Sequence, residues 1–395
     1  MRIVDVNVRV FNYTSTIVRD DEGHTHPGED HDARAQLLTV VCDDGSEGYS
    51  FGPVGHAVVN SYIKPLVVGE DPYFREKIWQ HLVHNQRGSG GTLNDRVLAT
   101  FELALWDLAG RKLGLPVFKL LGAFRDKVPA YGSTTCGDEL KGGLSTPEEY
   151  ARFAEWLVKR GYKSIKLHTW MPPIKWAPDP KMDVKACAAV REAVGPDIAC
   201  TLDCYHAYSR EDAYYIGREL EKLNYYWLEE PMDEHSTSSY TWLAEQLDIP
   251  ILGPESAEGK AQTRAEWIVQ KASDMTRTGV MDVGGIIPSM KIVHLAESHG
   301  ISCEIHSPGA GNLHVLGAMA IPGKWYERGL LHPFTDYEVP PPWLNRIIDP
   351  MDKDGFVPVP QGPGLGYDIN FAYINGNLVK ERRLSRPKPA TPGLV

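Results

Sequence analysis

The sequence predicts an α/β fold in which a large parallel barrel is joined to a smaller domain. The chain has 395 residues, of which 42% are hydrophobic, so it is long enough to build both parts. From Val128 onward, short apolar runs alternate with amphipathic helix patterns, as in parallel α/β proteins. Three of these runs end in an acid, at Asp203, Glu229 and Glu255, and their spacing of 26 residues is that of one strand and helix unit.

Residues 1–127 follow a different pattern and are predicted to form the smaller domain. Apolar and polar residues alternate over 3–11 and 36–51, which is typical of antiparallel strands. A long helix is predicted over 94–112, because apolar residues recur there at helical spacing and Gly114 follows as a stop signal. We therefore expect a short strand meander followed by helices.

Residues 128–345 are predicted to form the barrel, and 346–395 a C-terminal segment. Helices such as 147–160 separate the barrel strands, and the last dozen residues of the chain, rich in proline and polar side chains, are expected to be loosely ordered. In a parallel barrel the active site lies at the carboxyl ends of the strands. The eight predicted strands lie in the runs KVPAYGST, YKSIKLH, IACTLD, YYWLEE, IPILGPE, SDMTRTG, ISCEIH and KWYERG.

The three evenly spaced acids predict a metal site. A single carboxylate at a strand end is usually solvated, but consecutive parallel strands would bring Asp203, Glu229 and Glu255 to the same rim. Three carboxylates with water make an octahedral oxygen site, which a hard divalent cation prefers. The sequence therefore predicts Mg2+ as the cofactor, held by these three side chains.

Composition narrows the class of partner. The formal net charge is -11, so no basic surface is available for nucleic acid or an anionic membrane. No apolar run approaches the length of a transmembrane helix, and the first ten residues alternate like a strand instead of resembling a signal peptide. The six cysteines include no Cys-x-x-Cys pair, which favours buried free thiols. We expect a cytoplasmic protein that binds a small molecule.

Several motifs together carry a resemblance to a known family. The sequence resembles the enolase superfamily, in its mandelate racemase subgroup, over essentially its whole length. The resemblance implies a modified (β/α)7β barrel with an α+β capping domain formed from both chain ends. It also implies Mg2+ on the three spaced acids and abstraction of the proton α to a carboxylate, giving an enediolate. The motifs are FELALWDLAGRKLGLPVFKLLG from Phe101, the EEP that begins at Glu229, DVGGI from Asp282, His306, WYE ending at Glu327, and GPGLGYDI.

Lys166 and His168 are the predicted base side of the site. They stand two residues apart at the end of one predicted strand, so both point to the same face. In the subgroup this place usually holds Lys-x-Lys, with the first lysine beside the substrate carboxylate and the second acting as base. His168 stands where the second lysine would be, and neutral imidazole is a competent base near neutral pH.

His306 departs from the pattern of the subgroup. There, a histidine at this place is oriented by an aspartate five residues before the glycine pair, but here that position is Gly279. Asp282 is offset by three residues and is expected beyond the strand end, so we do not assign it that role. Without a carboxylate partner, His306 is expected to keep an ordinary pKa and to protonate a leaving hydroxyl. Glu327 matches a position that binds the substrate carboxylate in the subgroup.

These expectations favour a Mg2+-dependent sugar-acid dehydratase that yields a 2-keto-3-deoxy acid. One base and one acid suffice for dehydration, whereas a racemase needs two matched bases. A lactone cycloisomerase and an epimerase or racemase remain alternatives within the superfamily, and a sugar-acid-binding barrel without catalysis is the alternative of another class. The substrate is expected to be an aldonate or aldarate, and the chain to form a homo-oligomer.

Two further expectations concern the surroundings of the site. Residues 14–34 and 50–56 are predicted to be capping loops, the first a polar lid that hydrogen-bonds sugar hydroxyls, with a second metal site on its histidines as the less favoured alternative. The two-residue period of strands also places Arg277 and Glu304 on inward faces of adjacent strands. Since an unpaired buried charge is costly, we predict an ion pair between them beneath His306.

Overall fold

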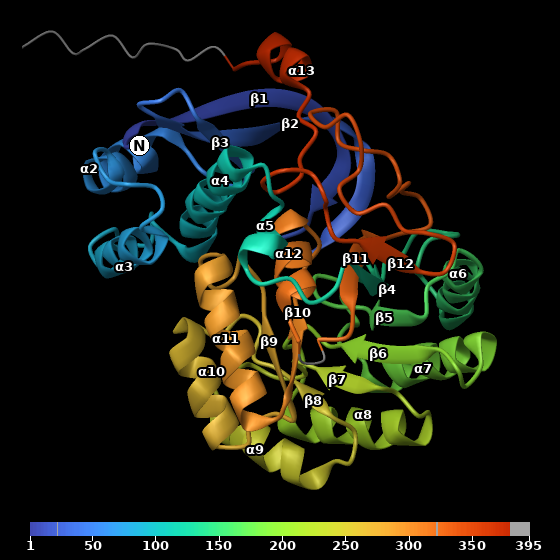
Figure 1. The fold of residues 1–395 in the computed structure, drawn as a ribbon. Coiled ribbons are helices and arrows are strands. Elements are labelled where there is room, and N and C mark those ends of the chain that lie inside the picture. Colours follow the sequence, from blue (N-terminus) through green and yellow to red (C-terminus); the bar gives the residue numbers. More distant parts are fainter. Residues whose placement is uncertain (22, 321–322, 380–395) are drawn as a thin grey trace, which may run out of the picture.

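The computed structural model describes residues 1–21, 23–320 and 323–379, which form a barrel with a smaller domain over one end (Figure 1). The eight barrel strands are parallel, and the last pairs with the first to close the barrel. This confirms the predicted fold class and all eight predicted strands. In sequence and spatial order the strands are β4 (Lys127–Thr134), β5 (Ser164–His168), β6 (Ala199–Asp203), β7 (Trp227–Glu229), β8 (Ile251–Leu252), β9 (Met275–Thr278), β10 (Ser302–Ile305) and β11 (Tyr326–Leu331).

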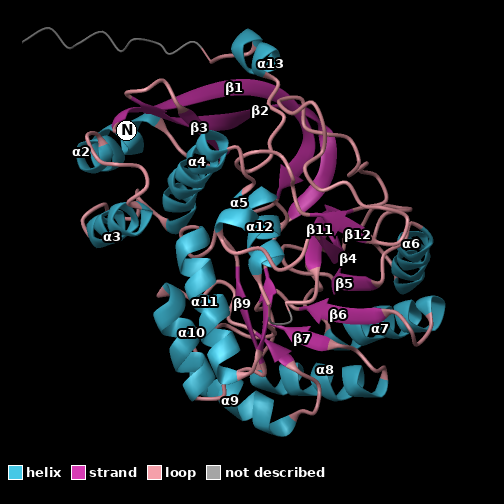
Figure 2. Ribbon diagram, in the orientation of Figure 1, coloured by secondary structure: helices cyan, strands magenta, loops and turns pink. Residues whose placement is uncertain are grey.

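Helices cover the outside of the barrel (Figure 2). Each strand from β4 to β10 is followed by one helix, which gives the modified (β/α)7β pattern. In the first of these helices Tyr150, Phe153 and Leu157 recur at helical spacing and are buried against the strands, while the Thr146 side chain caps its start. The helices are α6 (Pro147–Lys159), α7 (Pro180–Val194), α8 (Arg210–Lys222), α9 (Thr237–Gln246), α10 (Lys260–Val269), α11 (Ile286–His299) and α12 (Ala310–Ala318).

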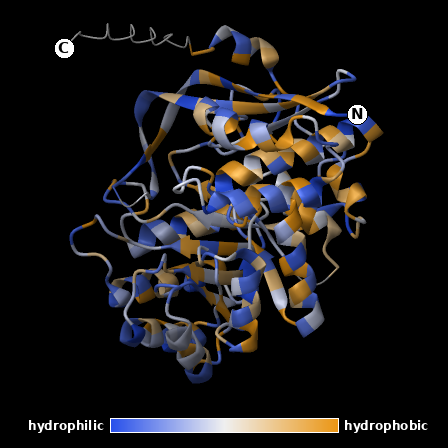
Figure 3. Ribbon diagram, turned by 90° about the vertical axis from the view of Figure 1, so that its left-hand side faces the viewer, coloured by the Kyte–Doolittle hydropathy of each residue, from blue (hydrophilic) through white to orange (hydrophobic). Residues whose placement is uncertain are grey.

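The smaller domain, which we call the cap, is an antiparallel sheet packed against helices. Its sheet has the order β1-β2-β3 and carries its own hydrophobic core with the helices. Hydrophobic and hydrophilic residues alternate along the first half of β1, whereas the outer part of β2 is mostly hydrophilic. Figure 3 colours the chain by this property. The elements are β1 (Ile3–Arg19), β2 (Thr25–Cys42), β3 (Glu47–Phe51), α1 (His56–Val58), η1 (Val59–Ile63), α2 (Lys64–Val67), α3 (Arg75–Gln86), α4 (Asp95–Leu113) and α5 (Val117–Leu120).

The cap differs from the sequence prediction over residues 14–34. Instead of a loop, β1 and β2 continue through this segment and pair as far as Arg19 and Thr25, so the two strands form one long hairpin. Both faces of its outer part are largely solvated, which removes the apolar alternation that reveals a strand. The residues that reach the barrel are therefore those at the hairpin tip.

Helix α4 ties the cap to the barrel. The Asn94 side chain accepts the N–H of Val97 at its start, and Gly114 ends it in the left-handed conformation, as the sequence predicts. The Glu102 carboxylate, in the middle of α4, accepts the first N–H groups of α11, from Ile286 and Ile287, at 2.9 and 3.0 Å. Because a carboxylate stabilises a helix N-terminus, this contact fixes the cap on the barrel rim.

The C-terminal segment contacts both parts of the fold. Strand β12 (Phe356–Pro358) pairs antiparallel with β4 at the barrel, and after α13 (Phe371–Gly376) Leu378 bridges to Phe11 of β1. The proline-rich end, 380–395, lies outside the described residues. All six cysteines are buried and free. Within the described ranges, every helix is too short or too polar to cross a membrane.

Candidate active site

A cavity of about 450 Å3 lies where the carboxyl ends of the barrel strands face the cap. Lys166, His168, Asp203, His306 and Glu327 all line it, as does Glu255. His168 and Asp203 end β5 and β6, His306 and Glu255 follow β10 and β8, and Lys166 and Glu327 lie within β5 and β11. Successive parallel strands bring these positions to the same end of the barrel. The sequence-predicted residues are thus brought together from β5 to β11, together with Glu229, which lies buried beside them.

The three spaced acids lie on neighbouring strands. Asp203 and Glu229 are register partners at the ends of β6 and β7, and Glu255 follows β8 in the next loop. All three are buried, with Glu255 the most exposed at 9%. The described chain also holds two clusters whose ligand atoms lie within 4.8 Å of one another, Asp20 with His24 and His26, and His206 with Glu230 and Glu234.

Two cations lie among the carboxylates. The ammonium of Lys166 lies 2.9 Å from Asp203 Oδ2, 3.1 Å from Glu229 Oε1 and 2.9 Å from Glu327 Oε1. The guanidinium of Arg277 lies 2.9 Å from Glu229, 2.7 Å from Glu255 and 2.8 Å from Glu327. Burial disfavours both charges, but the surrounding carboxylates raise the pKa of both side chains well above their usual values. Lys166 and Arg277 are therefore permanent cations in the floor of the site.

The predicted ion pair between Arg277 and Glu304 is wrong. Both side chains are buried and point inward, but among the described residues the carboxylate partners of Arg277 are the three above it. Glu304 instead accepts the backbone N–H groups of Lys324 and Trp325 at 2.9 and 3.3 Å. The long side chain of Arg277 reaches the three acids at the rim and pairs with them. The backbone N–H groups of Lys324 and Trp325, just before β11, satisfy Glu304.

His168 is held at both ring nitrogens. Nδ1 lies 2.7 Å from the carbonyl oxygen of Thr134, which can only accept, so Nδ1 carries a proton. Nε2 lies 2.9 Å from Asp203 Oδ2 and is the nitrogen that faces the cavity. A backbone carbonyl on one nitrogen fixes both the tautomer and the direction of the ring.

His306 does have a carboxylate partner, contrary to the expectation from Gly279. Its Nδ1 lies 2.7 Å from Asp282 Oδ2, and its Nε2 lies 3.0 Å from Glu255 Oε1. The N–H of Asp282 donates to the Gly279 carbonyl, so the chain turns back and returns the carboxylate to the site. A Cβ at Gly279 would overlap Asp282 Oδ2. Asp282 therefore occupies the space that a side chain at 279 would fill.

The expected ordinary pKa of His306 is wrong for the same reason. Burial acts to lower the pKa of this imidazole, but the carboxylates of Glu255 and Asp282 outweigh burial and raise it well above the usual value. His306 thus belongs to an oriented pair whose Nε2 points into the cavity.

The donor set fits a hard divalent cation. Five buried carboxyl groups and the partly buried Asp282 lie around or beside two permanent cations, so negative charge is in excess. Burial raises the pKa of Glu229 to about 7, and burial together with Glu255 raises the pKa of Glu230 well above its usual value. Carboxylates that resist ionisation at neutral pH are stabilised by a bound cation. The six are Asp203, Glu229, Glu230, Glu255, Asp282 and Glu327.

Sequence reasoning missed several residues of this cavity. Arg19 and His24 come from the hairpin tip, Arg96 from the first turn of α4, and Tyr205 and His206 from the loop after β6. The histidine-rich composition of residues 14–34 indicated the first of these segments. Arg96 lies on a helix with an ordinary amphipathic pattern, and only the tertiary fold brings it to the cavity.

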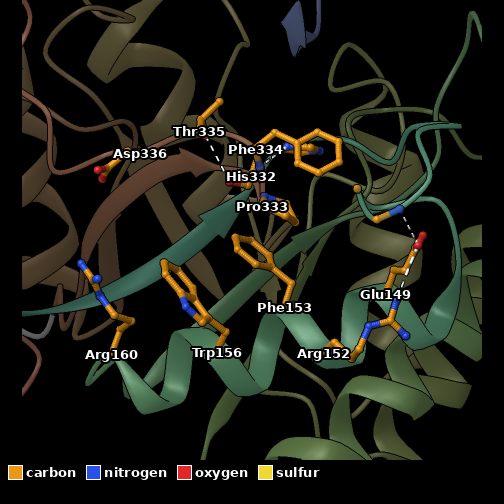
Figure 4. A pocket seen from close by; sticks show the side chains of 12 residues that line it. Glu149, Arg152, Phe153, Trp156, Arg160, His332, Pro333, Phe334, Thr335 and Asp336 are labelled. Carbon is orange, nitrogen blue, oxygen red and sulfur yellow. Dashed lines mark hydrogen bonds and ion pairs between the residues drawn. The ribbon is translucent and has the colours of Figure 1, made fainter.

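A second cavity, of about 520 Å3, lies outside the barrel rim (Figure 4). It lies between α6 and the residues after β11, with Phe153 and Trp156 stacked on one side and Phe334 on the other. Its charged groups are partly paired, since Arg152 lies 3.5 Å from Glu149 and Arg160 lies 3.2 Å from Glu338. None of the predicted catalytic or metal residues lines it, so the first cavity is the candidate active site.

Comparison with known proteins agrees with this geometry. Residues 14–122 match the N-terminal domain of mandelate racemase and muconate lactonizing enzymes, and residues 149–373 match the enolase C-terminal domain-like family. The crystal structure of D-glucarate dehydratase from Agrobacterium tumefaciens complexed with magnesium is 58% identical, with a TM-score of 0.94, and the match covers 96% of this chain and 100% of that one.

Curated relatives match at lower identity. Arabinonate dehydratase of Saccharolobus solfataricus is 31% identical over 361 residues, which is 86% of this chain and 89% of that protein. L-talarate/galactarate dehydratase of Salmonella typhimurium is 29% identical over 344 residues, 85% of this chain and 80% of that protein. The family models match both parts of the fold, and the site lies at the strand ends of the barrel. The chain therefore belongs to the enolase superfamily, in its mandelate racemase subgroup.

Proposed function

We propose that this enzyme is a Mg2+-dependent dehydratase of an acid sugar, with an aldarate such as D-glucarate as substrate. It is a carbon–oxygen lyase of its superfamily, as the relatives named dehydratases are. One observation carries the proposal. Two imidazoles, His168 and His306, approach one cavity from different sides above a rim of buried carboxylates. Strand β5 is three strands from β10 in one direction around the barrel and five in the other.

The proposed metal ligands are Asp203, Glu229 and Glu255. Their hard oxygen donors and the excess of buried carboxyl groups support this assignment. Mg2+ bound there would act as a Lewis acid on the substrate carboxylate and make the neighbouring C–H more acidic. Lys166 and Arg277 remain in the floor as fixed positive charges beside the same carboxylates.

His168 is the proposed base. The bond from Nδ1 to the Thr134 carbonyl makes Nε2 the ring nitrogen that faces C2, and Nε2 would remove the C2 proton once Asp203, its partner at 2.9 Å, turns to the metal. The electron pair left at C2 delocalises into the adjacent carboxylate, and the nearby ammonium of Lys166 stabilises that charge. Lys166 and Arg277 hold the pKa of Glu327 well below its usual range, so Glu327 is an ionised acceptor, and its proposed role is to fix Lys166 beside the substrate carboxylate.

His306 is the proposed acid. Asp282 holds its Nδ1, so Nε2 is directed to the substrate from the side of β10. As the C3–O bond breaks, Nε2 donates a proton to the hydroxyl, which leaves as water. The resulting enol loses its O–H proton at C2, gains a proton at C3, and so becomes the 2-keto-3-deoxy acid. Asp282 acts as a positioning residue, because it touches the imidazole and not the substrate.

Epimerisation at C2 is the second candidate, and one observation favours it. The pairing of His306 with Asp282 gives the site a second oriented imidazole, so the lack of a partner no longer argues against a two-base reaction. Relatives of both kinds match at similar identity, 29% for L-talarate/galactarate dehydratase and 28% for an L-Ala-D/L-Glu epimerase. An epimerase would change the configuration of the acid without forming a keto product.

A substrate screen tests the proposal. The protein is incubated with Mg2+ and a library of aldarates and aldonates, and products are read as semicarbazones and by proton NMR in D2O. We expect D-glucarate to give a 2-keto-3-deoxy product. Deuterium at C2 of recovered acid with no semicarbazone would favour the epimerase instead. Absence of both product and exchange across the library would contradict either reaction.

A further inference from the structure

We propose that Arg19 and Arg96 form an anion subsite on the cap side of the cavity, which binds the carboxylate remote from the reacting C2 carbon. This inference rests on the proposed dehydration of an acid sugar. It assigns the preference for a dicarboxylate over a monocarboxylate to two residues of the cap.

All carboxylates that line the cavity come from the barrel, beside basic groups such as Lys166, whereas the ionisable groups from the cap are all basic. Among the described residues, the cap contributes Arg19, His24 and Arg96, all of which are basic. The barrel contributes every carboxylate of the lining, at Asp203, Glu230, Glu255, Asp282 and Glu327. The barrel end therefore suits a metal cation, which can in turn bind a substrate carboxylate. The cap end suits an anion without a metal.

The hairpin tip holds Arg19 over the cavity. Asp20, the next residue, accepts the backbone N–H of His24 at 2.9 Å and lies 2.8 Å from His26 Nε2. The His24 ring meets Tyr205 edge to face, with ring centroids 4.3 Å apart, and the Tyr205 N–H donates to Asp203 Oδ1 at 3.0 Å. The tip thus rests on the loop of a proposed metal ligand, and Arg19 is the last residue of β1 before that contact.

Arg96 enters the cavity from the first turn of α4. Its neighbour Asp95 is paired with Lys260 at 2.8 Å and accepts from Gln86, so the surrounding surface is already matched. By contrast, no carboxylate in the described ranges pairs with the side chain of Arg96 or of Arg19, and both are exposed at the cavity. A guanidinium free of other partners can take a carboxylate in a bidentate geometry.

A six-carbon diacid would use both ends of this cavity. With one carboxylate beside Lys166 at the barrel end, the other must point toward the cap, where the two arginines lie. A monoacid of the same length places a neutral hydroxymethyl group there and gains no charge-assisted bond. The subsite therefore acts on affinity and on kcat/KM for diacids, without contact with the reacting atoms.

The test compares Arg19→Gln, Arg96→Gln and the double variant with wild type on D-glucarate and D-gluconate, which differ only at C6. Arg87→Gln is the matched control, because Arg87 is an exposed arginine of the cap outside the cavity. Charge-assisted bonds of this kind predict a loss of about 10-fold in kcat/KM for D-glucarate in each single variant and about 100-fold in the double variant. D-gluconate should change less than about 3-fold on the same reasoning, and Arg87→Gln should match wild type on both acids.

Equal losses on the two acids, or no loss on D-glucarate, would overturn the subsite. Calorimetry separates its failure from failure of the proposed reaction, because binding of each acid to the Mg2+-loaded protein needs no turnover. Tighter binding of D-glucarate than of D-gluconate by wild type, lost in the double variant, supports the subsite even if neither acid reacts. Equal binding of both acids by wild type contradicts it.

Discussion

Replacing Gly279 by alanine should displace Asp282 from His306 and so disable the proposed acid, although neither His306 nor Asp282 is itself substituted. The added Cβ would overlap Asp282 Oδ2 and would lie 3.0 Å from the His306 carbonyl oxygen and 3.2 Å from its Cβ. The backbone and imidazole of His306 are held by neighbours, so the Asp282 carboxylate must move. Losing the 2.7 Å charge-assisted bond to Nδ1 costs about 1.5–3 kcal/mol, which is about 10-fold to 100-fold in dehydration rate.

The pKa of His306 gives a readout that is independent of substrate. Asp282 and Glu255 raise this pKa in the native protein, so displacing Asp282 must lower it and the imidazolium must lose its proton at lower pH. NMR titration of the ring in metal-free protein measures the shift. Gly376→Ala is the control, because a Cβ there meets nothing within 4 Å.

A double-mutant cycle sharpens the same prediction. If Gly279→Ala acts only by displacing the carboxylate, Gly279→Ala with Asp282→Asn should be no worse than Asp282→Asn alone. Wild-type dehydration and an unchanged His306 pKa in Gly279→Ala would refute the reasoning. Additive losses would show that the glycine is needed for some other reason.

Three further predictions concern the barrel. Glu229→Gln removes one of three anionic ligands, so it should abolish turnover and weaken Mg2+ binding measured by calorimetry; activity without added metal would refute the metal assignment. His306→Asn should keep C2 hydrogen exchange in D2O while losing dehydration, and His168→Ala should lose both; the opposite result would reverse the acid and base roles. Burial raises the pKa of Glu304 from 4.5 to about 7, so the folded state binds this proton more tightly and stability falls as pH rises from about 4.5 to about 7. In urea titrations, Glu304→Gln should remove up to about 3 kcal/mol of this loss of stability across the pH range, and an unchanged pH dependence would contradict the raised pKa of Glu304.

Regular features of the sequence predicted most of the fold. The parallel strands are buried on both faces, so each reads as a short apolar run, and the helices between them carry a clear amphipathic period. The spacing of Asp203, Glu229 and Glu255 follows from the length of one strand and helix unit. These signals are local or periodic, and they survive without knowledge of tertiary contacts.

The errors fall where the local pattern does not determine the tertiary contact. Asp282 lies beyond β9, where no period predicts side-chain direction, and a turn onto the Gly279 carbonyl returns it to His306. For Arg277 the face was predicted but not the partner, because a long side chain can reach a different layer from its Cα. Arg96 could not be found from the sequence, since its role depends on how the cap sits over the barrel.

The most direct test of the account follows D-glucarate by proton NMR in D2O with purified protein and Mg2+. Wild type should consume the acid and form one equivalent of a 2-keto-3-deoxy product, and removing Mg2+ with a chelator should stop the reaction. Glu229→Gln should give neither product nor C2 exchange under the same conditions. Product formed at the wild-type rate in the presence of chelator, or by Glu229→Gln, would contradict the central claim.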